Sequence, residues 1–516
     1  MKRWSLSTRW KWLAAAATIS ASIFFMLPGQ PANTAPHSNG IAKVLDPSET
    51  VPEANPIVTE NQQQGTTAWR ISGPSGHNLE GFASSVSAVP DSTLDVYVSS
   101  NYETYSVLVF RLGWYRGHGG RLLWRRASLQ GHRQAPQRFD TSTHMVEVRW
   151  SKSFSVPVGA DWTTGYYVIA LRGPEGRGSY IPFIVKEASR KAPLLAQASV
   201  TTWQAYNAWG GTSLYNGTLP WGQHHHGLRA DVVSFDRPYA TGNGAGNLFT
   251  YEFAYVSWLE AHGFDVGYTT DIDTHTDPQT LKGRKAFLSL GHDEYWSSAM
   301  RSNLEAALGS GVSAAFLGAN DIYRHIRLEP SWVGPNRHEV NYRSTADPLS
   351  AKDPRETTVQ WRDSPVNQPE DAILGEMYEC NPVHADLVVN DTVGWLFEGT
   401  GLRKGDHIKG LVGKEYDKVF HKHPGDRSST LVFKSPLTCG GKASEQDSVL
   451  RVISSGAIVF DAGDLTFACA FSGCPSSPAD ERIQRLIHNL LDHLLGDRTS
   501  ASPGQPSAAK GSIAKP

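Results

Sequence analysis

The sequence predicts an α/β C-terminal domain with a mostly parallel sheet, preceded by a β-sandwich domain. Between about residues 64 and 188, short runs such as Leu94–Val98 and Phe154–Val158 alternate apolar and polar side chains. From about residue 195, strand-like runs alternate instead with segments of helical period. A length of 516 residues leaves room for two or three domains.

In the first of these regions, Gly, Pro, Asn and Asp separate the runs, which is typical of an antiparallel sandwich. We assign residues 64–190 to this domain and expect an immunoglobulin-like arrangement. Its large aromatic side chains are Trp114, Tyr115, Trp162 and Tyr166. Core packing explains them more readily than a carbohydrate-binding platform, which stays as the alternative.

The second region, residues 195–497, carries the α/β signals. Helices are predicted at Tyr251–His262 and after a cap at Ser297 or Ser298, and buried strands at Lys285–Leu290 and Ser313–Leu317. A late strand at Gly456–Phe460 precedes a closing helix with apolar residues from Ile483 to Leu494. Strand and helix alternation of this kind favours a parallel sheet.

The N-terminus predicts export. A basic start is followed by the uncharged run Trp12–Leu27 and by Pro28. Residues 1–35 are therefore interpreted as a signal peptide, cleaved after Ala32 or Ala35, or as a retained anchor. We expect a disordered linker at 36–63 and a disordered tail at 498–516, where Pro, Ala, Ser and polar residues dominate.

Charge and cysteine usage agree with a secreted or extracytoplasmic location. Lys and Arg total 48 against 50 Asp and Glu, so there is no basic signature of nucleic-acid binding. The four cysteines allow a small Cys469–Cys474 loop and a Cys380–Cys439 pair, as expected in an oxidising compartment. Membrane contact is expected only through the N-terminal segment, and oligomerisation stays open.

Three segments that follow predicted strands hold candidate chemical groups, because active sites in parallel sheets lie at the carboxyl ends of strands. These are Gly291–Trp296, Gly318–Asp321 and Asp461–Asp464. The first is the most crowded with titratable side chains, and burying that many without a purpose would be costly. Asp and Asn at the other two could merely cap turns.

Other motifs are weaker. The sequence contains no GxSxG elbow, HExxH or Walker A pattern, so a triad hydrolase lacks its nucleophile at the crowded turn. The run His224–His226 could bind a metal but is more typical of a solvated loop. The acidic segment Asp271–Asp277 alternates like a calcium loop, yet it lacks the central Gly and the terminal Glu of an EF-hand.

Several of these segments occur together and in order in one known family. They are Thr202–Ser213, Tyr251–Glu260, the Gly-His-Asp-Glu-Tyr-Trp turn at 291–296, Phe316–Asn320 and Gly375–Pro382. Residues 195–497 thus resemble the large (beta) subunit of N,N-dimethylformamidase. The resemblance implies a class I glutamine-amidotransferase-like α/β domain that holds one ferric ion through two Tyr phenolates and one Glu carboxylate.

Carried onto this chain, the resemblance implies iron ligands Tyr251, Tyr295 and Glu379. Tyr255 is a rival for the first position and Glu376 for the last. Phenolate and carboxylate oxygens suit ferric iron, which can polarise an amide carbonyl and acidify a bound water.

Beside that iron, His292, Asp293 or Glu294 would act as the acid or base, and Asn320 could donate to the oxyanion. The predicted function is an exported hydrolase of carbon–nitrogen amide bonds in a small molecule or the cell envelope. The small partner subunit of the family's enzyme has no counterpart within this chain. The alternative is a non-catalytic surface or secreted protein that binds polysaccharide or a protein partner.

Overall fold

The computed structural model describes residues 55–217, 228–420 and 428–496. The described residues belong to one compact unit. The predicted signal or anchor segment, the C-terminal tail and His224–His226 lie outside the described residues. No helix in the described ranges is long and apolar enough to cross a membrane.

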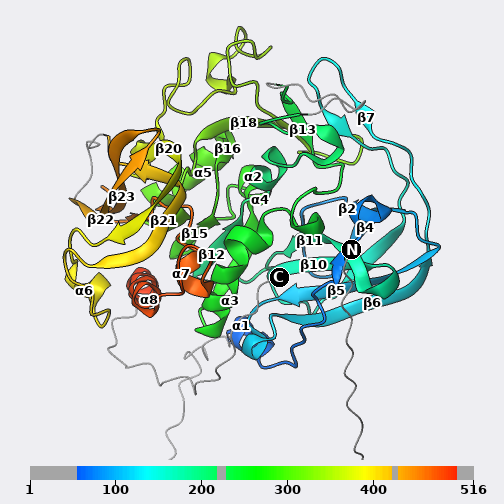
Figure 1. The fold of residues 1–516 in the computed structure, drawn as a ribbon, viewed down its shortest axis with the longest axis horizontal. Helices are drawn as coiled ribbons and strands as arrows, with labels where there is room; N and C mark the ends of the chain where they lie inside the picture. Colours follow the sequence, from blue (N-terminus) through cyan, green and yellow to red (C-terminus); the bar gives the residue numbers. More distant parts are fainter. Residues whose placement is uncertain (1–54, 218–227, 421–427, 497–516) are drawn as a thin grey trace, which may run out of the picture. The chain divides into compact units, whose positions relative to one another are not determined.

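The β-rich N-terminal part contains two main sheets (Figure 1). The smaller is antiparallel, and the larger is antiparallel except for two short strands that pair in parallel with one of its members. One has the order β1 (Gly73–Pro74), β11 (Arg177–Val185), β10 (Gly165–Arg172), β5 (Thr104–Leu112) and β6 (Gly120–Gln130), with β3 (Ser87–Ala88) beside β11. The other has the order β2 (Leu79–Ala83), β4 (Ser92–Ser100) and β9 (Phe154–Val158). A small ladder joins β7 (Arg138–Phe139) to β8 (Val146–Glu147).

The two sheets share one core because apolar side chains recur at every second position of their strands and point toward each other. Val96 and Leu94 of β4 meet Val107 and Val109 of β5 in a single buried cluster. The opposite face of the larger sheet is buried as well, since Tyr166 of β10 belongs to the core that surrounds the second half of the chain. Of the four aromatic residues considered as a carbohydrate platform, Trp162 and Tyr166 pack in these cores, and Tyr115 is buried with its hydroxyl bonded to Arg111 and Glu60.

The second half is built on a mixed sheet of seven strands. Its order is β14 (Val266–Thr270), β12 (Leu194–Ala198), β15 (Ala286–Gly291), β17 (Ser313–Gly318), β24 (Ile458–Asp461), β23 (Lys442–Val452) and β22 (Ser428–Cys439). Neighbours from β14 to β24 pair in parallel, and β23 and β22 are antiparallel. The strand pair β20 (Met377–Val388) and β21 (His407–Lys418) is antiparallel. A four-stranded sheet has the order β13 (Val232–Ser234), β19 (His338–Val340), β18 (Arg324–Glu329) and β16 (Tyr295–Ser297).

The helices are few and mostly short. They are α1 (Pro56–Asn61), α2 (Val200–Ala205), α3 (Phe253–Ala261), α4 (Asp271–Thr276), α5 (Ser298–Gly309), α6 (Gly394–Phe397), α7 (Cys469–Ser472) and α8 (Glu481–Leu495). Single turns are η1 (Gly76–Asn78), η2 (Tyr115–Gly117), η3 (Pro174–Gly176), η4 (Trp209–Gly211), η5 (Gly242–Gly244), η6 (Leu248–Glu252), η7 (Pro354–Glu356) and η8 (Glu370–Ala372).

The predicted fold class is wrong. Of the described residues, 37% lie in strands and 21% in helices, and the sheets are mixed or antiparallel. They do not form a mostly parallel, class I glutamine-amidotransferase-like α/β domain. The prediction extended the strand–helix–strand unit around residues 286–318 over the whole C-terminal half. It missed the long antiparallel strands β20 to β23, which carry polar side chains and show little apolar periodicity.

Individual elements near the site follow the sequence closely. Ser297 caps α5 by accepting from the Met300 N–H, and the helix ends at Gly309 as expected. Alternate residues of β15 face two different cores. Leu288 lies in the core that contains α3 and α8, and Phe287 lies in the core that contains α5. A strand buried on both faces explains the continuous apolar run.

Helix α1 lies inside the segment predicted as a linker. Asn55 caps it by accepting from the Ile57 N–H, and Ile57 is fully buried in the main core. Glu60 and Asn61 at its end are buried as well. Apolar burial and a helix cap therefore order these residues in spite of their polar surroundings in the sequence.

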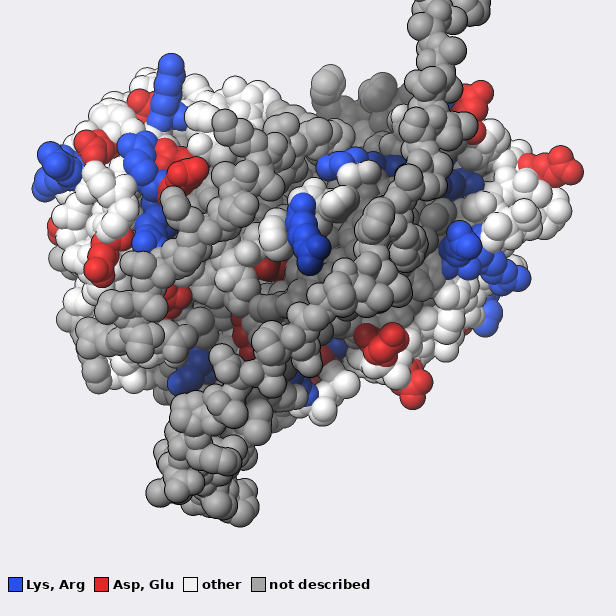
Figure 2. All heavy atoms as spheres, turned by 90° about the horizontal axis from the view of Figure 1, so that it is seen from below, with Lys and Arg blue, Asp and Glu red and all other residues white. Residues whose placement is uncertain are grey.

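Both predicted disulfides are confirmed: Cys380 pairs with Cys439 and Cys469 pairs with Cys474. These bonds agree with an extracytoplasmic location, because disulfides persist in oxidising compartments. The face shown in Figure 2 carries Lys and Arg side chains interspersed with Asp and Glu.

A buried ion pair joins the β-rich part to helix α3. Arg111 of β5 binds Glu260 through two contacts, Nη2–Oε1 at 2.7 Å and Nη1–Oε2 at 3.0 Å, and both side chains are fully buried. Arg111 also donates to the Thr164 carbonyl at 2.8 Å. Glu260 accepts from Asn61 of α1 at 2.8 Å and from Tyr268 of β14 at 3.1 Å. Four elements therefore meet at one carboxylate.

Removing Arg111 should cost far more stability than removing a surface cation. Arg111→Met leaves the Glu260 carboxylate buried without its cation, so the free energy of unfolding should fall by about 3–5 kcal/mol in urea titration. The matched control is Arg149→Met, because Arg149 is 48% exposed and pairs with Glu147 at 3.4 Å. The control should lose about 0–1 kcal/mol. Equal losses for the two variants would contradict this role of the buried pair.

A buried histidine makes the fold sensitive to acid. His325 of β18 donates from Nδ1 to the Thr357 carbonyl at 2.9 Å and accepts the Ser298 hydroxyl at Nε2, also at 2.9 Å. Burial lowers its pKa to about 4, with Glu356 the nearest carboxylate at 3.8 Å. The unfolded chain therefore binds a proton between pH 6.5 and 4 that the folded chain refuses.

The expected outcome is a loss of about 3 kcal/mol from this residue as pH falls from 6.5 to 4. In His325→Gln, that part of the pH dependence should disappear from unfolding free energies measured across the same window. His77→Gln, at an exposed position, should keep the wild-type pH profile. An unchanged profile in His325→Gln would show that other groups cause the acid sensitivity.

Candidate active site

The crowded turn follows strand β15, and its shape depends on two glycines. Gly291 has φ +80°, and a Cβ there would lie 2.7 Å from the Cβ of Tyr251. Gly318 pairs with Gly291 across β15 and β17, and a Cβ at Gly318 would lie 1.5 Å from the Gly291 carbonyl oxygen. Only glycine allows this approach of the two strand ends. The turn at 292–294 and Asn320 therefore follow neighbouring parallel strands.

Glu294 of this turn meets two tyrosines. The Tyr206 hydroxyl donates to its Oε2 at 2.8 Å, and the Tyr215 hydroxyl lies 2.6 Å from Oε1 and 2.7 Å from Oε2. The two phenol rings stack with centroids 4.3 Å apart. Glu294 is 1% exposed. We call these three residues the tyrosine–glutamate cluster.

The cluster is positioned by local backbone contacts. Tyr206 directly follows α2, and the Thr202 hydroxyl of that helix accepts the Glu294 backbone N–H at 2.9 Å. Tyr215 lies beyond the turn η4, where Arg237 donates to the carbonyls of Trp209 and Thr212 at 3.0 and 2.9 Å. The segment between the tyrosines is therefore tied down, and both phenols reach the same carboxylate.

Electrostatics hold these phenols in their protonated form. Burial raises the pKa of both Tyr206 and Tyr215 well above the ordinary value, and the negative charge of Glu294 raises it further. Two cationic side chains lie close by. The Arg343 guanidinium sits 4.3 Å from the Tyr215 ring centroid, and Arg324 Nε lies 3.6 Å from Glu294 Oε1. A cation bound by the phenol oxygens would replace their protons.

His292 lies between two carboxylates. Its Nε2 is 3.3 Å from Glu415 Oε2 and 3.5 Å from Glu294 Oε2, and its side chain is 4% exposed. Burial lowers the pKa of His292, but the facing Glu415 and Glu294 charges more than offset this and leave it above the ordinary value. Asn320 donates to Glu415 Oε2 at 2.8 Å, so it holds the carboxylate that faces the imidazole.

Asp293 has different surroundings from the other predicted catalytic residues. Its carboxylate accepts from Ser289 and Gln197 at 2.9 Å and from the Trp296 indole N–H at 3.0 Å. Burial raises its pKa to about 6. The structure thus gathers His292, Glu294 and Asn320 in one contact network, while Asp293 braces the turn against the sheet.

The predicted metal ligands occupy three separate sets of contacts. Tyr251 accepts from Lys414 Nζ at 2.8 Å, and Tyr295 accepts from Arg343 at 2.8 Å. Glu379 of β20 accepts from the hydroxyls of Tyr416 and Ser444. None of these contacts joins two members of the predicted set.

The rival residues have their own partners or surroundings. The Tyr255 hydroxyl donates to the Leu317 carbonyl at 2.6 Å. Glu376 is fully buried, and neither of its carboxylate oxygens has a hydrogen-bond partner among the described residues. In the acidic segment read as a calcium-like loop, Asp271 and Asp273 instead begin helix α4, where Asp273 completes the capping box with Thr270.

Sequence reasoning missed Tyr206 and Tyr215 as site residues. Tyr206 lies inside the motif Thr202–Ser213, which carried the family resemblance without being given a chemical role, and Tyr215 lies two residues beyond it. Glu294 was expected to act as an acid or base, and the structure places it in contact with both tyrosines. Among the described residues, no three or more His, Cys, Asp or Glu side chains are grouped so that they could hold a metal ion. The cluster contributes only one carboxylate, and its other two donors are phenols.

Comparison with known proteins supports one family. No curated protein matches the chain. One solved structure, a cycloisomaltooligosaccharide glucanotransferase from Paenibacillus sp. complexed with cycloisomaltoheptaose, aligns at 8% identity over 75% of this chain and 67% of that one. Its TM-score of 0.16 carries no argument. The sequence profile described as "N,N-dimethylformamidase beta subunit-like, C-terminal" matches residues 106–480, most of the chain. The chain therefore belongs to the N,N-dimethylformamidase beta subunit-like family.

Proposed function

We propose that this protein is an exported hydrolase of carbon–nitrogen amide bonds whose metal is held by Tyr206, Tyr215 and Glu294. One observation carries the proposal: two partly buried tyrosines converge through their hydroxyls on one buried carboxylate in a chain of this family. Two phenolates and one carboxylate match the ligand set expected of the family and balance the charge of a ferric ion. Tyr251, Tyr295 and Glu379 remain the rival ligand set.

The donor chemistry of the cluster fits such an ion. Phenolate and carboxylate are hard anionic oxygen donors, which suit ferric iron better than soft metals. Burial without a metal leaves both phenols protonated, and an ion of high charge is what would favour their deprotonation. When bound, such an ion supplies Lewis acidity that polarises an amide carbonyl and acidifies water.

The remaining chemistry belongs to side chains of this chain. His292 Nε2 lies beside Glu294 and faces Glu415, so a proton on Nε2 is stabilised from both sides. That proton is available to the amine that leaves when the amide bond breaks. Asn320 orients Glu415 through its amide N–H. We therefore assign proton delivery to His292 and positioning to Glu415 and Asn320.

An exported protein would meet only substrates that occur outside the cytoplasm. The two disulfides support an oxidising compartment, and the basic, then uncharged N-terminus supports secretion or tethering through residues 1–35. We propose an amide in a small molecule or in the cell envelope as substrate. A nucleic acid is not a partner in this proposal, and the protein could act as an oligomer.

Iron loading tests the ligand assignment directly. Full-length protein supplied with ferric iron should show a visible phenolate-to-iron absorption band and stoichiometric bound iron. Tyr206→Phe and Tyr215→Phe should each remove or strongly weaken both signals, because each deletes one donor oxygen and leaves the ring in place.

The controls for iron loading are Tyr251→Phe and Tyr295→Phe, the tyrosines of the rival set. They should keep the absorption band. If these two lose it while the cluster variants keep it, the ligands are those of the rival set. A colourless wild-type protein that takes up no iron would sink the metal-dependent proposal and favour the non-catalytic alternative.

His292 should affect turnover more than metal binding. His292→Gln should lower kcat for formamides and acetamides by about 10²- to 10⁴-fold, the range typical of a general acid or base. The iron absorption band should persist, since the proton donor is distinct from the ligands. His407→Gln is the matched control, because His407 is 59% exposed and far from the cluster in sequence. Wild-type kcat in His292→Gln would remove this residue from the proposed chemistry.

A further inference from the structure

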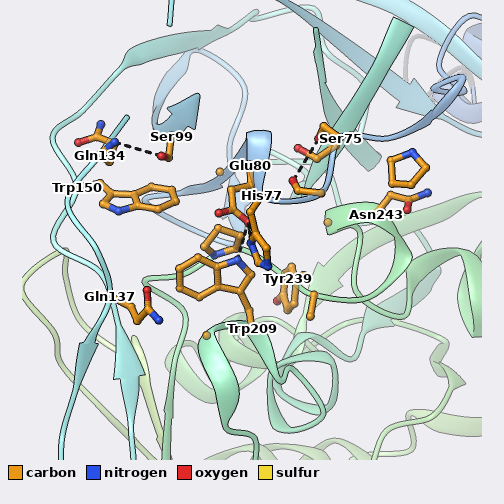
Figure 3. A pocket seen from close by; sticks show the side chains of 18 of the residues that line it. Ser75, His77, Glu80, Ser99, Gln134, Gln137, Trp150, Trp209, Tyr239 and Asn243 are labelled. Atoms are coloured by element: carbon orange, nitrogen blue, oxygen red, sulfur yellow. Dashed lines mark hydrogen bonds and ion pairs between the residues drawn. The ribbon is translucent and has the colours of Figure 1, made fainter. Parts of the chain in front are cut away.

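A separate cavity lies between the β-rich part and the second half of the chain. Its volume is about 770 Å³, within the range of small-molecule sites. One side comes from η1, β2, β4, β11 and the loops after β6 and β8, and the other from η4, η5 and the loop after β13. No member of the tyrosine–glutamate cluster lines it. Figure 3 shows Trp150, Trp209, His77 and Tyr239 around this space.

Two buried hydroxyls in the lining lack partners. Ser179 is 7% exposed, and neither its Oγ nor the Tyr239 hydroxyl has a hydrogen-bond partner among the described residues. A buried polar group without a partner destabilises the fold, and most such groups in folded proteins are paired. Both hydroxyls can donate and accept, so a ligand with hydroxyl groups would satisfy them.

The charged side chains of the lining are already engaged. Glu80 accepts from the Trp209 indole N–H at 2.7 Å and lies 3.0 Å from His77 Nδ1. Arg133 donates to the Asn101 side chain at 2.9 Å. Glu80 is paired with His77, and Arg133 is an exposed residue whose hydrogen-bond partner is a neutral amide. The buried part of the lining therefore offers hydroxyls and indole rings, which favours an uncharged ligand.

Two indole rings add flat apolar surface. Trp150 and Trp209 lie edge to face with centroids 6.0 Å apart. Their N–H groups are spent, because Trp150 donates to the Ala135 carbonyl at 2.8 Å and Trp209 to Glu80. The indoles are therefore fixed in orientation and contribute ring surface rather than donors. Ring surface beside hydroxyls and the amides of Gln137 and Asn243 matches the mixed C–H and O–H faces of a sugar.

We propose that this cavity binds a neutral saccharide, with Ser179 and Tyr239 as hydrogen-bonding residues and Trp209 as a ring platform. The proposal is independent of the amidase chemistry, because it rests on residues outside the tyrosine–glutamate cluster. In an exported protein, such a site would anchor the protein to a glycan.

Isothermal titration calorimetry of the full-length protein tests this proposal, with cellotriose, maltotriose and tri-N-acetylchitotriose as probes. At least one probe should bind. Tyr239→Phe and Ser179→Ala should each weaken that binding by about 2- to 12-fold, the worth of one hydrogen bond. Both variants should fold like the wild type, since each removes a hydroxyl that bonds to nothing in the described protein.

The matched controls are Ser199→Ala and Tyr102→Phe. The Ser199 hydroxyl is also buried without a partner, and neither residue lines the cavity. Both controls should bind the saccharide with wild-type affinity. Absence of binding to all three probes, or equal affinity in Tyr239→Phe, Ser179→Ala and the wild type, would overturn the proposal. Binding of trialanine amide at these residues in place of any sugar would replace the saccharide with a peptide.

Discussion

The ion pair between Arg111 and Glu260 is the constraint on which the arrangement of this protein depends. Two opposite charges are removed from water at the point where β5, α1, α3 and β14 meet. Such a pair contributes little net stability against a well-packed apolar alternative, but it leaves no tolerance for a misplaced partner. It therefore specifies how the β-rich sheet docks more than how strongly it docks. The cavity is lined by residues from both halves of the chain, so its shape depends on how the halves dock.

The candidate active site follows the same principle at Glu294. A fully buried carboxylate needs partners, and the chain supplies two phenols that donate to it. This arrangement is stable with protons on the phenols, which both donate to the carboxylate. Under the proposed function, the Glu294 carboxylate that now accepts the two phenol protons would bind the metal ion in their place. His292 and Glu415 extend the network beyond the tyrosine–glutamate cluster, since His292 Nε2 lies 3.3 Å from Glu415 Oε2.

What the sequence predicts well here is local. Helix α5 is recognisable from Ser297 to Gly309 because its cap and apolar period lie within one short segment. The runs that became β15 and β17 are recognisable because burial on both faces makes them continuously apolar. The turn at 291–296 stood out for its density of titratable groups, and His292 and Glu294 do lie at the centre of the network. The antiparallel strands β20 to β23 were not predicted, because their sequences mix polar and apolar residues on both faces and show little apolar periodicity.

The tyrosine pair could not be found by spacing, because the chain between Tyr206 and Tyr215 is irregular. Their convergence depends on contacts from distant residues, such as Arg237 donating to the Trp209 and Thr212 carbonyls. Glu376 and Glu379 show the complementary problem. Three residues apart in the sequence, one is fully buried and the other meets Tyr416 and Ser444. An alignment by eye has no means to separate such neighbours.

The same irregular segment connects the two sites. Tyr206 enters the tyrosine–glutamate cluster, and Trp209, three residues later, forms part of the cavity wall. Asn207 between them fixes the turn, since its side chain accepts the Trp209 N–H at 3.1 Å and donates to the Pro238 carbonyl at 2.9 Å. A saccharide that contacts Trp209 therefore contacts the same segment that carries Tyr206, a proposed metal ligand. Coupling of this kind requires the segment to have two arrangements with different affinities for the ligand. The many bonds to Asn207 and Arg237 argue for one rigid arrangement, so recognition in the cavity should position a substrate without altering the chemistry at Glu294.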